Sequence, residues 1–157
     1  MEDLAVMFFD DQQDPTPDAH VLSKEKLDFS IESLVHVEEY LDFVRTQKRT
    51  GKPLQILVLR AGGYVGEVIR RHAKHKHWHW LDFPEASKLE ADIIAMGYSI
   101  HTAAILWDAR KGRSRFVFPL GKVMKYLQNG EEDSVRFFVQ VIINDAPDDP
   151  NPAPIHP

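Results

Sequence analysis

Residues 53–80 read PLQILVLRAGGYVGEVIRRHAKHKHWHW, and this stretch decides how the chain folds. It holds the densest apolar run of the sequence, its tightest glycine cluster and half of its histidines. An apolar segment long enough for a buried helix is followed by alternating histidine and tryptophan, a pattern typical of a strand. We therefore expect these residues to form the central elements of the domain.

The first part of this stretch admits two structures. In one, a buried strand over residues 55–60 turns at the glycines into a helix over residues 64–71. In the other, residues 54–72 form one buried helix, on which Gly62 and Gly66 share a face and let another backbone approach closely. Glycine inside a helix costs up to about 1 kcal/mol relative to alanine, so packing or function must offset that cost. We favour the single helix.

Apolar periodicity and turn signals place the other elements. The spacing predicts a helix from Ser30 to Thr50 and a short strand or docking segment over residues 4–9. Residues 85–98 fit either a short helix or a loop that enters a strand. We expect strands over residues 77–83, 102–107 and 114–118, and helices over residues 120–129 and 131–142. The fold class is α+β, with N-terminal helices, a central antiparallel sheet of three or four strands and two C-terminal helices.

The length of 157 residues, with 43% hydrophobic and 27% charged residues, indicates one domain with a sizeable core. We expect an N-terminal segment and loop over residues 1–27, the α+β domain over 28–144 and a mobile Pro/Asp-rich tail over 145–157. The chain has no cysteine, which excludes disulfides and thiolate metal sites. No apolar run approaches the roughly 20 residues that cross a bilayer, and the acidic start does not resemble a signal peptide. These features predict a cytoplasmic protein without a membrane partner.

The net charge of −5 is unevenly distributed. Every charge before Lys24 is acidic, whereas the section from Arg45 to Lys76 holds nine Lys or Arg residues against the single acid Glu67. This basic section either faces an anionic partner or is partly neutralised by the acidic ends of the chain. We favour neutralisation. The acidic net charge also argues against a dedicated nucleic-acid binder.

Glu67 is the residue of the basic section most open to a functional role. On a helix it has Arg70 at i+3 and Arg71 at i+4, so an ion pair is the simplest expectation. The alternative is a carboxylate in a groove opened by the glycines, acting as a general base or as a partner anchor. No catalytic set is visible. The candidate binding residues are Tyr64, Gly66, Glu67, Arg70, Arg71 and Trp78.

His75, His77 and His79 alternate, so on a strand they would share one face about 6–7 Å apart. Zinc and copper both accept imidazole, and His72, His101 or Glu67 would complete a two-histidine metal site. The HExxH spacing is absent. The simpler expectation is that the tryptophans between the histidines face the core, that the histidines face water and that no cofactor is bound.

A phosphate-binding turn is a further alternative under the strand–turn–helix structure. It would use the glycines at residues 62–66 with Arg60, Arg70 and Arg71. The GxGxxG order and the GxxxxGK[ST] motif are both missing, so packing is the simpler role for the glycines.

The order GGYVGEVIRR, HWHWLDF and FPLGKVMKYLQNGEEDSVRFF resembles a set of small uncharacterised bacterial proteins. These carry a Gly-x-Tyr-x-Gly-Glu-Val-Ile helix followed by a Trp-containing strand, and the resemblance covers roughly residues 27–143. It implies a shared fold and no particular activity. Some proteins of this general style are immunity or accessory partners of secreted toxins, which is an analogy. The matching positions are Gly62 or Gly63, Tyr64, Gly66, Glu67, Trp78 or Trp80, Pro119, Val123, Leu127 and Gly130.

The leading expectation is a bacterial, non-enzymatic protein-interaction domain of an immunity-like or regulatory type. It would use the groove around Tyr64, Gly66 and Glu67 or the basic face. The alternatives are a metal-dependent or acid–base enzyme that uses Glu67 and the histidines of residues 72–79, and a binder of a phosphate-bearing small molecule.

Overall fold

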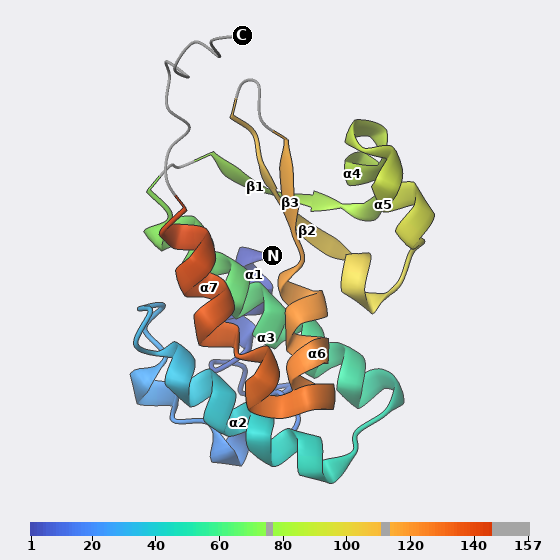
Figure 1. Cartoon of the computed structure of the whole chain (residues 1–157). Coiled ribbons are helices and arrows are strands. Elements are labelled where there is room, and N and C mark those ends of the chain that lie inside the picture. The colour runs from blue at the N-terminus through green and yellow to red at the C-terminus, as the bar shows by residue number, and fades with distance from the viewer. Residues whose placement is uncertain (75–76, 111–113, 146–157) are drawn as a thin grey trace, which may run out of the picture.

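Helix α3, Gly51–His72, is the central element of the molecule (Figure 1). The computed structural model describes residues 1–74, 77–110 and 114–145 of the chain. In it α3 is one continuous helix, so the single-helix prediction for residues 54–72 is confirmed. Residues 60–69 are all buried, which means that every face of this part of the helix is covered. Although α3 has 22 residues, no helix of the described segments has the length and apolar content of a membrane span.

Four helices build the lower part of the molecule around α3 (Figure 1). Helices α1, α6 and α7 contact α3 directly, while α2 packs against α6 and α7. At Gly62, α3 approaches α6 too closely to admit a side chain, because a Cβ there would lie 2.8 Å from the Leu120 side chain. The bounds are Glu2–Met7 for α1, Leu34–Gln47 for α2, Pro119–Asn129 for α6 and Val135–Ile143 for α7.

The described strands form one antiparallel sheet in the order β1-β2-β3. Strand β1 is Trp78–Asp82, β2 is Ala104–Asp108 and β3 is Arg115–Val117. In the register, Trp80 faces Leu106, and Leu106 also faces Val117. Helices α4 (Phe83–Leu89) and α5 (Ala91–Met96) connect β1 to β2 and cover a small second core around Ala86, Ile93 and Ile105. The α+β class, the central antiparallel sheet and the two closing helices are therefore as predicted.

Several boundaries differ from the sequence-based prediction. Residues 4–7 belong to helix α1 rather than to a strand, residues 8–9 form the turn that follows it, and residues 85–98 lie mostly in two short helices. Helix α2 begins at Leu34 instead of Ser30, because residues 30–33 form a turn in which Ser33 N donates to Ser30 Oγ at 3.1 Å. Short 3-10 turns cover Ala19–Val21, Lys24–Lys26, Ile100–Thr102 and Gly130–Asp133. The predicted mobile tail lies outside the described residues except for Asp145, which pairs with Arg115.

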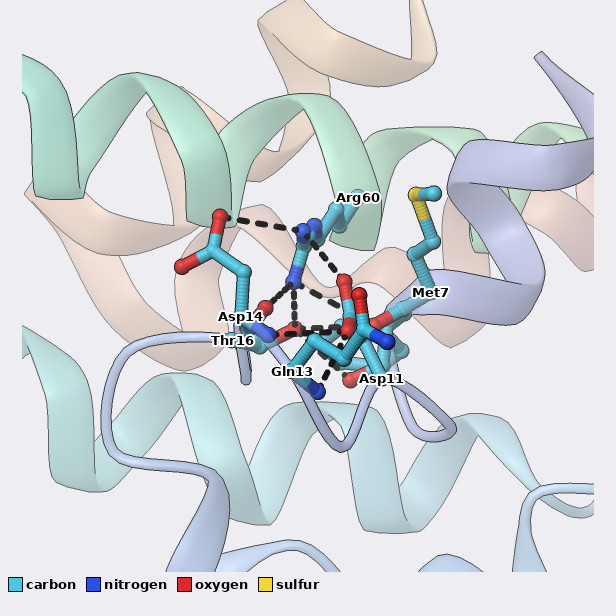
Figure 2. Close-up of polar contacts among 7 residues, drawn as sticks. Met7, Asp11, Gln13, Asp14, Thr16 and Arg60 are labelled. Atoms are coloured by element: carbon cyan, nitrogen blue, oxygen red, sulfur yellow. Dashed lines mark hydrogen bonds and ion pairs between the residues drawn. The ribbon is translucent and has the colours of Figure 1, made fainter.

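Arg60 ties the N-terminal segment to α3. Figure 2 shows its guanidinium reaching from the helix into the loop at residues 11–16. Nη1 donates to the Asp14 carbonyl at 2.7 Å, and Nη2 donates to Asp11 Oδ2 at 3.0 Å. The Asp11 carboxylate also accepts the backbone N–H groups of Asp14 and Gln13. These backbone hydrogen bonds, with the nearby guanidinium, lower the pKa of Asp11. The buried arginine thus organises a loop, which leaves it little capacity for a ligand.

The acidic N-terminal segment neutralises part of the basic section. Its acids reach three arginines on or next to α3, in the pairs Asp11–Arg60, Asp18–Arg49 and Glu2–Arg71. Its apolar side chains join the main core; they include Ala5, Phe8, Leu22 and Leu27. Residues 1–27 therefore pack as part of the same body as the rest of the described chain.

Gly66 is the position at which α3 meets the sheet. A Cβ there would lie 2.2 Å from Cζ2 of Trp80, whereas the nearest atoms to a Cβ at Gly63 would be at 3.4 Å. We therefore predict that Gly66→Ala lowers the free energy of unfolding by about 1–3 kcal/mol, because the indole must move. Gly63→Ala is the matched control and should change stability by less than about 1 kcal/mol, since it gains helix propensity. Urea denaturation of both variants measures this, and equal stability of the two would show that Trp80 does not need the glycine.

Candidate functional site

A surface pocket of about 400 Å³ opens beside the C-terminal end of α3. Helix α3 contributes Glu67, Arg70 and Arg71, strand β1 contributes Trp78, and helix α1 contributes Glu2. Four of the predicted binding residues thus line one pocket. Its lining is charged apart from the tryptophan, which suits recognition of a charged group better than of an apolar molecule.

The carboxylate of Glu67 lies at the inner side of this pocket and is only 2% exposed. Its Oε1 accepts hydrogen bonds from Arg70 Nη1 and from the indole Nε1 of Trp80, both at 2.8 Å. Its Oε2 lies 3.8 Å from Arg71 Nε. Because a carboxylate oxygen has two lone pairs, Oε1 is fully engaged by these two donors. Glu67 therefore orients the side chains of Arg70 and Trp80.

Arg70 and Arg71 differ in whether their hydrogen-bond donors are already used by the protein. Arg70 is fixed by Glu67 and by the carbonyl of Trp78, to which its Nε donates at 3.3 Å. Arg71 lies 3.8 Å from both Glu67 and Glu2, which is beyond hydrogen-bond length. Within residues 1–74, 77–110 and 114–145 its guanidinium makes no hydrogen bond, and the side chain is 41% exposed. Arg71 therefore has donors available to a ligand.

Phe29 holds Arg71 in place. The Cζ of Arg71 lies 3.8 Å from the centroid of the Phe29 ring, a cation–π contact. Phe29 has a φ of +61°, a left-handed conformation that costs a non-glycine residue about 1–2 kcal/mol. Its backbone is held in this conformation from both sides. Its N–H donates to the Tyr64 hydroxyl at 2.9 Å, and its carbonyl lies 2.8 Å from Nε2 of His72.

Tyr64 packs against Phe29 and does not line the pocket. Its ring stacks on that of Phe29 with centroids 4.6 Å apart, and its hydroxyl lies 2.6 Å from Ser33 Oγ. Burial raises the pKa of Tyr64, so the hydroxyl stays protonated near neutral pH. Gly66 is also outside the pocket, beneath the indole of Trp80. These two predicted binding residues act through packing.

Sequence reasoning missed two residues of the site. The acids before Lys24 indicated that the N-terminal segment would reach the basic section, but nothing in the sequence pairs Glu2 with Arg71 in particular. Phe29 gave no signal at all, because a left-handed residue between Asp28 and Ser30 has no pattern of its own.

The described histidines do not gather at this pocket. His79 lies exposed on β1 with its ring 6.3 Å from that of Trp107, while the buried Trp78 faces the core. His77 is exposed, and its carbonyl accepts the N–H of Ala109. His75 lies outside the described residues. Among the residues that the structure describes, no group of three or more His, Asp or Glu side chains is placed to hold a metal ion.

Arg60 does not converge with Arg70 and Arg71. It lies ten residues earlier on the same helix, about 15 Å away at 1.5 Å per residue, and its guanidinium contacts the N-terminal loop. The three arginines considered for phosphate binding therefore do not form one site.

The Tyr64 hydroxyl should contribute measurably to stability. We predict that Tyr64→Phe lowers the free energy of unfolding by about 1–3 kcal/mol, because the buried N–H of Phe29 loses its acceptor. The control is Tyr98→Phe, since Tyr98 is 74% exposed and should give a change below about 0.5 kcal/mol. Chemical denaturation compares the two, and wild-type stability of Tyr64→Phe would mean that the hydroxyl does not hold Phe29.

Comparison with protein-family models, with characterised proteins and with solved structures gave no match to this chain. The resemblance to small bacterial proteins therefore stays a prediction.

Proposed function

We propose that this chain is a non-enzymatic protein-interaction domain that binds an acidic group of a partner protein at the pocket of Glu67, Arg70, Arg71 and Trp78. The observation that supports this most is that the guanidinium of Arg71 has hydrogen-bond donors available to a ligand. Its guanidinium is held against Phe29, faces the pocket and makes no hydrogen bond within the described residues.

A carboxylate is a suitable ligand for such an arginine. The planar guanidinium offers a fork of N–H donors that matches the two oxygens of a carboxylate, and these charge-assisted bonds are among the stronger ones in proteins. Stacking on Phe29 already restricts the side chain, so less conformational entropy is lost when a ligand binds. The charge of Arg70 is paired with Glu67, so Arg71 is the cation available to the ligand. Trp78 supplies an apolar wall of the kind common at protein interfaces.

An acid–base enzyme is supported less well by the same geometry. A general base must reach a substrate and accept its proton. Glu67 is almost fully buried, and its Oε1 already accepts two hydrogen bonds. Orienting the two arginines is the role that these contacts favour.

The wider biological role follows the sequence-based expectation. We propose a regulatory or immunity-like role in the bacterial cytoplasm, on the resemblance to small bacterial proteins and on the absence of cysteine.

Binding of a fluorescent oligoglutamate peptide, measured by anisotropy against an oligoglutamine control, tests the proposed function. We predict binding of the acidic peptide that weakens with salt, because the Debye length falls from about 10 Å at 0.1 M to about 3 Å at 1 M. Arg71→Ala should lower the affinity about tenfold or more, as expected for the loss of charge-assisted hydrogen bonds.

Arg49→Ala is the matched control for charge. The Arg49 side chain is also 41% exposed, but it pairs with Asp18 away from the pocket. Its substitution should leave the affinity nearly unchanged. Equal losses in the two variants would indicate unspecific attraction to a basic surface, and tighter binding of a phosphoserine peptide would favour the phosphate-bearing ligand instead.

A further inference from the structure

Glu2 is one of the residues that line the proposed binding pocket. It belongs to the first turn of α1, and its carboxylate is 67% exposed. Glu2 Oε1 lies 3.8 Å from Nη2 of Arg71, the guanidinium on which the proposed function depends. A carboxylate of the chain itself thus already stands near the atoms that a partner's carboxylate would contact.

The position of Glu2 is set by the packing of α1. Figure 1 shows this short helix lying beside α3. Ala5 and Phe8 are almost fully buried, and α1 packs on α3 beside Gly63, where an added Cβ would lie 3.4 Å from Ala5 N. Arg60 holds the loop that follows. The packing of helix α1 therefore fixes the position of Glu2 at the pocket.

The contact between Glu2 and Arg71 is weak enough to be displaced. The two groups are exposed and too far apart for a hydrogen bond, and surface ion pairs of this kind contribute little to stability. A carboxylate that makes two hydrogen bonds with Arg71 would interact more strongly. Until it is displaced, Glu2 offsets part of the charge of Arg71 that an incoming acid would use, and this lowers the apparent affinity for the acid.

We infer that Glu2 is a built-in competitor for the partner's acidic group, an inference that rests on the function proposed above. It partly screens Arg71 in the free protein and moves aside when the partner carboxylate binds. The pocket then retains ligands that bind Arg71 through both oxygens and discriminates against weaker anions.

The test measures the affinity for oligoglutamate of protein made without an N-terminal tag, as wild type and with Glu2→Gln or Asp3→Asn. Asp3 is the matched control, because it is an exposed acid of the same helical turn and does not line the pocket. Glu2→Gln should bind about two- to fivefold more tightly than Asp3→Asn, the range expected for one exposed ion pair. In the Arg71→Ala background this advantage should vanish, because the competition acts through Arg71.

The outcomes separate the two proposals. Equal affinities of Glu2→Gln and Asp3→Asn, with binding that still depends on Arg71, would overturn the role of Glu2 and leave the proposed function standing. An advantage of Glu2→Gln that persists without Arg71 would also overturn it. If neither wild type nor Glu2→Gln binds the peptide, the proposed function itself fails. Circular dichroism of each variant checks that the helices remain formed.

Discussion

The buried carboxylate of Glu67 joins the central helix to the sheet. It accepts a hydrogen bond from the indole of Trp80 on β1 and another from Arg70 on its own helix. Burying an ionised group is costly unless it is paired and hydrogen-bonded, and these two donors meet that requirement. The preceding residue, Gly66, leaves room for the ring of Trp80. The adjacent glycine and glutamate therefore act as one unit, in which the first admits the indole and the second binds it.

The same unit determines the surface beside it. Once β1 is fixed on α3, the carbonyl of Trp78 orients Arg70, and the next residue, Arg71, lies over the ring of Phe29. Phe29 is held in turn by Tyr64, whose hydroxyl accepts the Phe29 N–H and whose ring stacks on the Phe29 ring. A polar contact in the core and a stacked pair beneath the surface thus position two arginines around an open pocket. This layered support is what distinguishes them from ordinary surface charges.

The elements that the sequence predicted well are those that local spacing decides. The helix over residues 54–72 and the first strand carry strong periodic signals, and the i+3 and i+4 spacing places both arginines beside Glu67. Helix α1 was not predicted: residues 4–9 were expected to form a short strand or docking segment, because a helix of six residues is too short to show a helical period. Helix α2 begins later than predicted because Ser33, rather than Ser30, lies at its N-terminus. The hydroxyl of Ser33 also contacts Tyr64.

What the sequence could not predict depends on contacts between distant parts of the chain. Arg60 was a candidate for phosphate binding, but its guanidinium donates hydrogen bonds to a loop that lies 44–49 residues earlier in the chain. The bond from Trp80 to Glu67 and the left-handed Phe29 both arise only when separate elements pack together. No local propensity encodes these pairings, so the pocket itself could not be assembled from the sequence, although most of its residues were named.

A double-mutant cycle between Glu67 and Trp80 tests the central claim most directly. Unfolding free energies would be measured by urea denaturation for wild type, Glu67→Leu, Trp80→Phe and the double variant, because leucine, unlike glutamine, has no oxygen that could still accept the indole N–H. If the carboxylate holds the sheet to the helix through the indole, the two substitutions should be coupled by about 1–3 kcal/mol. Additive effects, with a coupling energy below about 0.5 kcal/mol, would contradict the claim that this hydrogen bond organises the structure.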